Sequence, residues 1–265
     1  MKLDHCNALI TGASAGLGRE FARQLAGRAR SLALVARREQ RLNELRDELM
    51  QQHPNLSVHV RKTNLADLAQ LEELIVWLER EKIDVDLLIN NAGLGDYGSF
   101  ATSDPARSDE MLMVNVVALT SLTRKLLPSM IARKRGAILN VSSSAGFLPI
   151  PGMAVYAASK AYVNSFSEAL RVELRGTGLS VSALCPGPVH TEFGEIAKRR
   201  GREPERGPEF VYVSAEQVVQ DALAALEADR PLVIPGLAMK LGMFLVRITP
   251  MSILRWAARF SAKRD

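Results

Sequence analysis

The sequence predicts an α/β fold organised around a doubly wound parallel sheet of about seven strands, with helices on both faces. Short apolar runs alternate with helical apolar patterns along the chain. A parallel sheet covered on both faces gives continuous apolar runs of this kind, whereas a sheet with one wet face gives alternating ones. A glycine-rich turn between the first run and the first helical pattern makes the expected sheet a Rossmann-type one.

The expected strands follow the apolar runs in chain order. They are predicted at 8–10, 32–35, 58–60, 87–89, 137–141, 181–184 and 232–234. No repeat array, low-complexity segment or Pro/Ser-rich linker interrupts this alternation. With 265 residues and 47% hydrophobic content, the chain is long enough for one large core. We therefore expect one domain over residues 1–235, with residues 236–265 as its C-terminal helical extension.

The first strand ends in the glycine-rich turn TGASAGLG at 11–18, after which Phe21, Ala22 and Leu25 carry a helical period. Glycines let the backbone approach a phosphate closely, and the helix N-terminus offers unpaired N–H groups and a partial positive charge. The turn therefore suits the pyrophosphate of a nucleotide. Its spacing is not the usual G-x-G-x-x-G, and a tight connection with no ligand is the alternative interpretation.

A second pattern pairs Tyr156 with Lys160 and places Ser143 thirteen residues upstream of the tyrosine. Positions i and i+4 share a helix face, so the Lys160 ammonium is expected beside the Tyr156 phenol. A neighbouring cation lowers the pKa of a tyrosine from its usual value of about 10, which would make Tyr156 a usable acid and base. Ser143 follows the strand at 137–141 and is placed to hydrogen-bond the same substrate oxygen. The alternative is an exposed Tyr and Lys on an ordinary helix.

Together these motifs resemble those of the classical short-chain dehydrogenase/reductase family over residues 5 to about 235. The turn at 11–18 matches the family's cofactor motif, and NNAG at 90–93 matches its strand-four motif. PGPVxT at 186–191 matches the loop that contacts nicotinamide. The resemblance implies the catalytic residues Ser143, Tyr156, Lys160 and Asn115. It implies a cofactor site formed by Gly12, Ser14, Ala15, Gly16, Leu17, Gly18, Arg37, Arg38, Asn64, Leu65, Asn91, Ala92, Gly93, Tyr156, Lys160, Pro186, Gly187, Val189 and Thr191.

The resemblance also implies a reaction. Hydride would pass between nicotinamide C4 and a substrate carbon while Tyr156 donates or accepts the proton on oxygen. Lys160 would hold the nicotinamide ribose, Ser143 would polarise the oxygen, and Asn115 would support a water relay. Residues 194–212 stand where the family places its substrate lid, and the basic run at 198–202 suits an anionic or carrier-linked substrate. One alternative is thus a carrier-linked 3-oxoacyl reductase, and another is a non-catalytic nucleotide-sensing or scaffold protein.

The end of the second strand bears on the choice of cofactor. In dinucleotide folds an acidic residue at this place binds the ribose 2′-hydroxyl of NAD, whereas a nearby arginine accepts the 2′-phosphate of NADP. Here the strand is followed by Ala36, Arg37 and Arg38, so no carboxylate repels a phosphate. Arg37 is placed for a bidentate contact, helped by Arg38 or the Ser14 hydroxyl. NADP(H) is therefore expected over NAD(H), unless the two arginines only begin a solvated helix.

The net positive charge of the chain comes from its C-terminal segment. Residues 236–265 carry six basic side chains against Asp265 alone, a net charge of +5 that equals the net charge of the whole chain. A nucleic-acid protein would carry a basic stripe across its folded body, and none is expected here. Apolar stripes on both sides of Pro250 predict two amphipathic helices. Packing on the same domain or on a sister subunit is favoured, and peripheral membrane contact through 237–265 is the alternative.

The remaining signals concern compartment and partners. The N-terminus shows no signal-peptide pattern and no apolar run reaches spanning length, so a cytoplasmic protein is expected, membrane-peripheral if the tail contacts lipid. Cys6 and Cys185 lack metal-type spacing, and no metal site is expected. The family's strand order would hold these two cysteines too far apart for a disulfide. We expect a small-molecule carbonyl or alcohol substrate and a homodimer or homotetramer.

Overall fold

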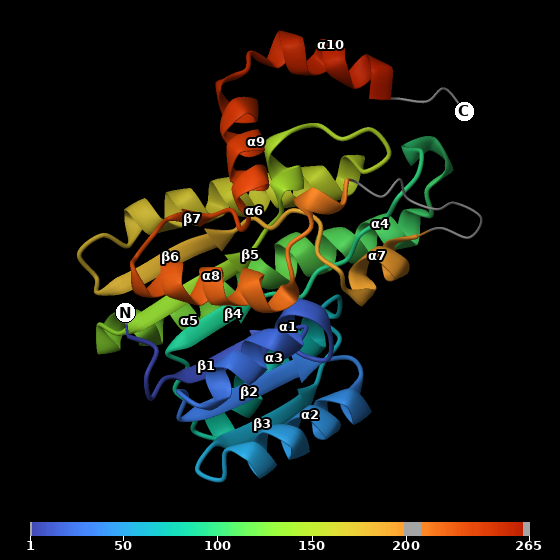
Figure 1. Cartoon of the computed structure of the whole chain (residues 1–265). Helices are drawn as coiled ribbons and strands as arrows, with labels where there is room; N and C mark the ends of the chain where they lie inside the picture. The colour runs from blue at the N-terminus through green and yellow to red at the C-terminus, as the bar shows by residue number, and fades with distance from the viewer. Residues whose placement is uncertain (1, 199–207, 262–265) are drawn as a thin grey trace.

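The computed structural model describes residues 2–198 and 208–261, in which seven parallel strands form one sheet in the order β3-β2-β1-β4-β5-β6-β7 (Figure 1). The strands are β1 Asn7–Thr11, β2 Ser31–Ala36, β3 Ser57–Lys62, β4 Leu87–Asn90, β5 Gly136–Val141, β6 Leu179–Leu184 and β7 Leu232–Val233. The predicted doubly wound parallel sheet is confirmed. Its order reverses between β1 and β4, the place where open sheets of this class bind ligands.

Helices cover both faces of the sheet. One face carries α1 Gly16–Ala26, α2 Glu39–Gln52 and α8 Ala215–Glu227. The other carries α3 Leu68–Arg80, α5 Leu119–Arg133 and α6 Ala154–Glu173. The shorter elements are η1 Phe100–Thr102, α4 Pro105–Leu112, the π-helix η2 Met113–Ala118, η3 Ser144–Phe147, α7 Glu192–Ala197 and η4 Glu209–Val211. The chain ends in α9 Leu237–Ile248 and α10 Met251–Ser261.

Strand β2 shows why the apolar runs are continuous. Leu32 and Leu34 belong to the buried cluster that includes α1, α2 and α8, whereas Ala33 and Val35 belong to the cluster on the other face, which includes α3, α5 and α6. Side chains alternate between faces along a strand, so both faces must be apolar when both are covered. The other predicted runs also lie within strands, except that β7 ends at Val233 and leaves the predicted Ile234 outside. Most strands are longer than predicted because polar end residues still pair through the backbone, as Ser31 does with Ser57.

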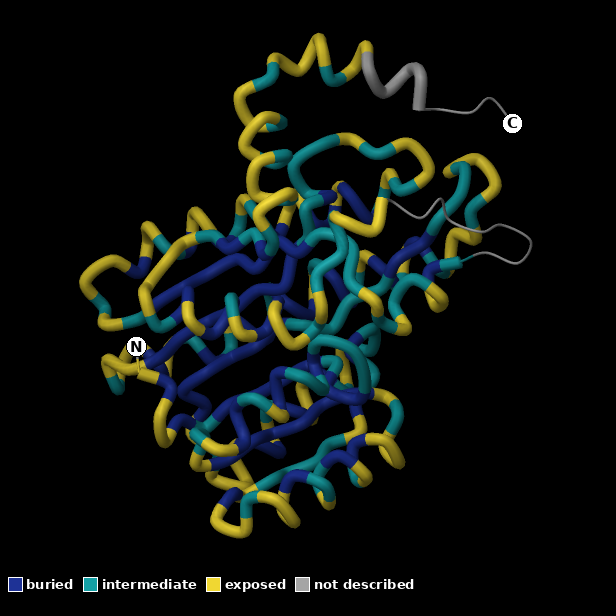
Figure 2. Tube along the Cα trace, in the orientation of Figure 1, coloured by how far each residue is buried: buried dark blue, intermediate teal, exposed yellow. Residues whose placement is uncertain are grey.

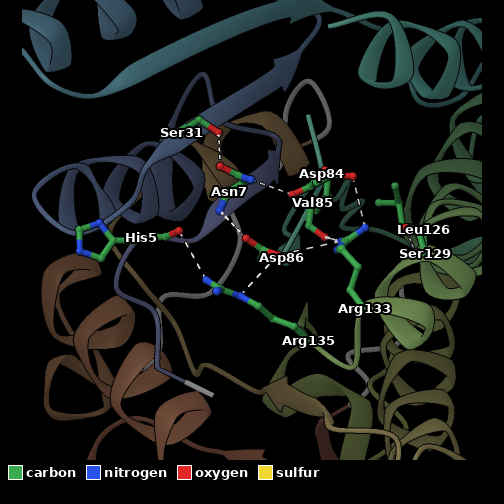
Figure 3. A network of polar contacts seen from close by, with 10 residues as sticks. All are labelled: His5, Asn7, Ser31, Asp84, Val85, Asp86, Leu126, Ser129, Arg133 and Arg135. Atoms are coloured by element: carbon green, nitrogen blue, oxygen red, sulfur yellow. Dashed lines mark hydrogen bonds and ion pairs between the residues drawn. The ribbon is translucent and has the colours of Figure 1, made fainter. Parts of the chain in front are cut away.

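A polar network fastens the amino ends of the strands (Figure 3). The Asp86 carboxylate accepts a hydrogen bond from the Asn7 backbone N–H (3.1 Å) and pairs with Arg135 (3.6 Å) and, more distantly, Arg133 (4.0 Å). The Arg133 guanidinium also donates to the Val85 carbonyl (2.7 Å). These contacts join β1, the start of β4 and the turn between α5 and β5, at the end of the sheet where the strands begin.

The two cysteines are buried and free. Cys6 precedes β1 and Cys185 follows β6, and β4 and β5 lie between those strands. Strands are spaced by about 4.8 Å, so the separation exceeds the roughly 7 Å that a disulfide allows between Cα atoms. The predicted separation of the two cysteines is confirmed.

The C-terminal segment forms two helices that meet at Pro250, as the apolar stripes predict. Figure 1 shows α9 rising from the body of the domain and α10 continuing from its end at a steep angle. Among the described residues, no helix is both long and apolar enough to cross a membrane.

Candidate active site

A cleft of about 890 Å³ opens at the carboxyl ends of the strands. It runs from the arginines after β2, past the glycine turn after β1, to Tyr156 and Lys160 on α6. The predicted cofactor residues other than Gly18 line it: Gly12, Ser14, Ala15, Gly16, Leu17, Arg37, Arg38, Asn64, Leu65, Asn91, Ala92, Gly93, Tyr156, Lys160, Pro186, Gly187, Val189 and Thr191. Ser143 lines it as well, whereas Asn115 lies buried behind it.

The glycine turn requires glycine at positions 12, 16 and 18 because of its backbone angles and its close contacts within the protein. Gly12 and Gly16 have positive φ angles of 67° and 51°, a region that glycine adopts without strain. A Cβ atom on Gly12 would approach the Asn91 amide nitrogen to 2.9 Å. A Cβ atom on Gly18 would meet the Gly12 carbonyl oxygen at 2.3 Å, which no structure accommodates without a shift. Gly18 therefore serves the packing of α1 against the turn and does not face the cleft.

The start of α1 fits a phosphate group. Its N-cap, Ala15, offers no side-chain hydrogen bond to the first turn, and Ala15, Gly16 and Leu17 line the cleft. The first N–H groups of a helix have no partner within the helix, and without a capping side chain they are free to bind an anion. Asn91 holds this turn in place, since its side-chain amide donates to the Thr11 carbonyl (2.9 Å). The residues present thus fit the pyrophosphate of a dinucleotide.

Two arginines stand at the far end of the cleft, but they have different partners. The Arg38 guanidinium donates to the Ser14 hydroxyl (3.2 Å) and to Glu192 (2.8 Å). Arg37 instead pairs with Glu110 of α4 (2.5 Å). Arg38 is also the N-cap of α2, so a helix does begin there, as the alternative interpretation held. The structure thus places Arg38, rather than Arg37, beside the Ser14 hydroxyl.

Glu192 is a residue that the sequence interpretation missed. Its carboxylate bridges Arg38 and Arg41 (2.8 and 2.7 Å), and these hydrogen bonds hold its pKa below the usual range. It begins α7, directly after Thr191, and lines the cleft. An acidic residue next to the expected nicotinamide loop was the available signal. Its contact with the arginines joins residues more than 150 positions apart, which spacing alone does not show.

Tyr156, Ser143 and Lys160 meet at the inner end of the cleft. Tyr156 is buried and forms a hydrogen bond with Ser143, which follows β5. Lys160 is also buried, and its ammonium donates to the Val141 carbonyl (2.9 Å). It lies 5.8 Å from the centre of the Tyr156 ring. Phe193 packs against the same ring at 5.6 Å between centroids, so α7 closes over the tyrosine.

The pKa values differ from the sequence expectation. Burial raises the pKa of Tyr156 to about 12, and the Ser143 hydrogen bond acts in the opposite direction. Burial also lowers the pKa of Lys160 to about 8. The predicted lowering of the Tyr156 pKa by Lys160 is wrong in this structure, because desolvation dominates and the ammonium is directed to Val141. Tyr156 is therefore protonated at neutral pH, the form that donates a proton.

Asn115 lies in the π-helix η2 and is fully engaged. Its amide oxygen accepts from the Leu94 N–H (2.8 Å), and its nitrogen donates to the Leu94 carbonyl and to Ser159 (both 3.0 Å). A side chain at Gly93 would come within 3.5 Å of the Asn115 oxygen and 3.4 Å of the Lys160 nitrogen. Asn115 thus fixes the loop beneath Lys160. A π-helix is a local insertion that often marks functional sites.

The region of the expected lid is described in part. Residues 199–207, with most of the basic run, lie outside the described residues. In the described part α7 and η4 flank the cleft, and Lys198 pairs with Glu195 (2.7 Å). His190, in the loop before α7, is largely exposed and stacks on Tyr212 at 4.3 Å between ring centroids.

A family model described as short chain dehydrogenase matches residues 6–200. The chain belongs to the short-chain dehydrogenase family. This short-chain dehydrogenase is therefore an oxidoreductase, and its fold matches solved members. The short-chain dehydrogenase from Sphingobium yanoikuyae in complex with NADPH superposes with a TM-score of 0.81 and 29% identity, covering 98% of this chain and 96% of that one.

Relatives differ in substrate and in cofactor. Sulfoacetaldehyde reductase 2 of Chromohalobacter salexigens is 41% identical over 70% of this dehydrogenase and 73% of that protein. Very-long-chain 3-oxoacyl-CoA reductase of Anas platyrhynchos is 32% identical over 72% of this dehydrogenase, which spans only 62% of that relative. A short-chain dehydrogenase from Burkholderia phymatum, solved with NAD, has a TM-score of 0.81, 27% identity and coverage of 92% and 94%.

Proposed function

We propose that this short-chain dehydrogenase is an NADP(H)-dependent enzyme that interconverts a carbonyl compound and its secondary alcohol. The observation that carries the proposal is that Tyr156, Ser143 and Lys160 lie together at one end of the cleft. At the other end are two arginines, and the position at the end of β2 is occupied by Ala36 instead of an acidic residue. Bound NADP(H) supplies or accepts the hydride. Gly12, Ala15 and Gly16 would cradle its pyrophosphate.

Each proposed catalytic residue has a distinct role. Tyr156, protonated at neutral pH, gives its proton to the developing alkoxide, and Ser143 donates a hydrogen bond to the same oxygen. Lys160, with a pKa of about 8, replaces the proton and holds the nicotinamide ribose. Asn115 positions the loop beneath Lys160 and supports a water relay from there to solvent.

The preference for NADP(H) rests on Arg38 and Ser14. A 2′-phosphate between them would gain a charge-assisted hydrogen bond and replace Glu192 as the anionic partner of Arg38. Arg37 would assist only after leaving Glu110. The NADPH complex of the Sphingobium relative supports this preference, whereas the NAD complex of the Burkholderia relative shows that the family uses both.

The substrate end of the cleft is apolar. Its lining includes Leu148, Ile150, Met153, Phe193, Met239 and Met243. We therefore propose a substrate with an apolar group beside its carbonyl. The name of the Anas relative favours a 3-oxoacyl thioester as a second candidate. Of the basic residues expected to bind such an anionic group, Lys198 is already paired with Glu195.

The proton-transfer role is tested with Tyr156→Phe. Turnover of NADPH with a panel of aldehydes, apolar ketones and a 3-oxoacyl thioester should fall by about 10²- to 10⁴-fold. NADPH binding, followed by fluorescence, should persist because only a hydroxyl is lost. Tyr162→Phe is the matched control, since this tyrosine lies on the same helix but is exposed and bonds Thr120. Undiminished turnover in the Tyr156 variant would remove the residue from the mechanism, and no turnover by the unaltered chain would favour a nucleotide sensor.

Cofactor choice is tested at the other end of the cleft. Arg38→Ala should weaken NADPH binding by about ten- to a hundredfold and leave NADH binding nearly unchanged, since a hydrogen bond to a charged group contributes about 1.5–3 kcal/mol. Glu192→Gln should tighten NADPH binding because Arg38 loses a competing carboxylate. Arg46→Ala, farther along α2, is the control. Equal losses for both cofactors in the Arg38 variant would contradict the assignment.

A further inference from the structure

Helices α9 and α10 expose large apolar side chains along their described length. We define the tail surface as eight side chains: Leu237, Leu241, Phe244, Leu245, Ile248, Met251, Ile253 and Trp256. Each of them is between 45% and 73% exposed. Helix α9 contains no buried residue, and Figure 2 shows it without the buried segments that mark the sheet. So many large exposed apolar side chains on two neighbouring helices are unusual for a protein that meets only water.

The opposite side of α9 attaches it to the domain. Met239 and Met243 line the cleft, and Met239 lies so close to Gly187 that a Cβ atom there would meet it at 2.7 Å. The Arg247 guanidinium lies 5.9 Å from the centre of the Phe147 ring. At about 100° per residue, the two methionines point away from Leu241 and Phe244. The α9 part of the tail surface is therefore the outer side of a helix whose inner side contacts the domain.

Charge indicates what covers the tail surface. Lys240 and Arg255 belong to the same two helices, and residues 236–264 contain no acidic side chain. A second copy of the same tail would bring positive charge against positive charge, and residues 1–235 carry no net charge to attract it. An anionic lipid surface complements both features, since it attracts each nearby Lys or Arg by about 1 kcal/mol and accepts apolar side chains between its headgroups.

Length and composition agree with a helix that lies on a membrane. At 1.5 Å per residue, the 12 residues of α9 extend about 18 Å, well short of the roughly 30 Å core of a bilayer. The exposed Trp256 is a residue type enriched at the boundary between lipid and water. Both helices are therefore suited to lie in the interface rather than to cross it.

We propose that α9 and α10 dock this protein on anionic membrane surfaces, with the tail surface inserted among the lipid headgroups and its basic residues beside anionic lipids. Docking would bring the apolar end of the cleft close to the bilayer, because Met239 and Met243 belong to the docked helix. That consequence rests on the proposed function, whereas the docking itself does not.

The test is sedimentation of the full chain with vesicles. The intact protein should bind vesicles of equal parts phosphatidylcholine and phosphatidylglycerol and should bind phosphatidylcholine alone far more weakly. Leu241→Glu with Phe244→Glu should reduce binding by at least about tenfold, because two large apolar side chains no longer enter the membrane. The matched control, Leu68→Glu with Val76→Glu, alters two equally exposed apolar residues of α3 and should bind as the intact protein does.

A second variant keeps the proposal testable if the double substitution disturbs folding. Arg255→Glu, on the exposed start of α10, should weaken binding to anionic vesicles at 0.1 M salt and make little difference at 1 M, where screening acts within about 3 Å. Absence of binding to anionic vesicles by the intact chain would overturn the proposal. So would size-exclusion chromatography in which the double variant, unlike the control, dissociates an oligomer, since a second copy would then cover the surface.

Discussion

At the scale of single residues, Lys160 is a buried cation that belongs to the proposed catalytic group. Its ammonium is buried and donates to the Val141 carbonyl, no carboxylate of residues 2–198 or 208–256 pairs with it, and burial lowers its pKa from 10.5 to about 8. The protein therefore carries a charge that destabilises it at neutral pH. A perturbed pKa in a cleft is typical of functional groups, and here it stands four residues from a tyrosine with a raised pKa. The two shifted pKa values support the proposed catalytic roles of Tyr156 and Lys160.

Lys160→Met should stabilise the protein at neutral pH. The folded-state pKa lies below the unfolded value, so the folding penalty is complete below pH 8 and disappears as pH rises toward 10.5. A shift of this size corresponds to roughly 3 kcal/mol, and the lost hydrogen bond to Val141 offsets about 1 kcal/mol of it. We expect an increase of about 1–2 kcal/mol in the free energy of unfolding at pH 7, fading by pH 10.

Urea denaturation at both pH values provides the measurement. Lys125→Met serves as control, because that lysine is partly exposed and pairs with Glu72, and it should show no comparable change with pH. A Lys160 variant that is less stable at pH 7 than at pH 10, relative to the intact protein, would show that the ammonium is better satisfied than the structure indicates.

The sequence located the candidate site well where local motifs carry it. Tyr156, Lys160 and the glycine turn are defined by spacing within one helix or one turn, and they line the cleft. The sequence favours Arg37 over Arg38, but both residues follow the strand directly. Only the three-dimensional positions of Ser14 and Glu192, which contact Arg38, distinguish them. The pKa of Tyr156 was misjudged because burial depends on the whole fold.

At the scale of elements, the connection from β1 to α1 is held by contacts that leave no room for a side chain. Gly18→Ala should lower the free energy of unfolding by about 2–4 kcal/mol, because its Cβ atom would meet the Gly12 carbonyl oxygen at 2.3 Å. Gly242→Ala in α9 is the matched control. Nothing lies within 4 Å of a Cβ atom there, so the variant should gain up to about 1 kcal/mol.

Chemical denaturation of the two glycine variants measures this difference. If Gly18→Ala is as stable as the control, the turn must relax at little cost, and the tight packing of α1 against it would not be what requires glycine. The sequence alone suggests a phosphate contact for all three glycines. It cannot separate Gly18, whose added Cβ atom would meet the Gly12 carbonyl, from Gly12 and Gly16, which line the cleft.

The π-helical form of η2 could not be predicted from the sequence pattern. The π-helix η2 continues directly into α5, and its apolar residues read like those of any helix. Its Asn115 contacts Leu94 and Ser159, which are distant in the sequence, and spacing alone does not show such contacts. The seven strands, in contrast, were all predicted, because a parallel sheet buried on both faces leaves a continuous apolar run for each strand.

At the scale of the whole molecule, the two ends of the sheet differ: one forms the cleft and the other carries a network of polar contacts. The cleft lies where the strands end, and the network around Asp86 lies where β1 and β4 begin. Parallel strands place all their carboxyl ends on one edge, so side chains there gather around a ligand while the other edge is free to be fastened. The two regions should therefore respond independently to mutation.

Asp86→Ala should test this separation. The buried carboxylate accepts from the Asn7 N–H and faces Arg133 and Arg135, so its removal leaves a partly buried donor unpaired and two cations without their shared partner. We expect the free energy of unfolding to fall by about 2–3 kcal/mol. The NADPH dissociation constant, measured where the variant is fully folded, should stay within about twofold, since changes at distant sites without shared partners are nearly additive. A large loss of NADPH affinity in the folded variant would show that the amino edge of the sheet also determines the geometry of the cleft.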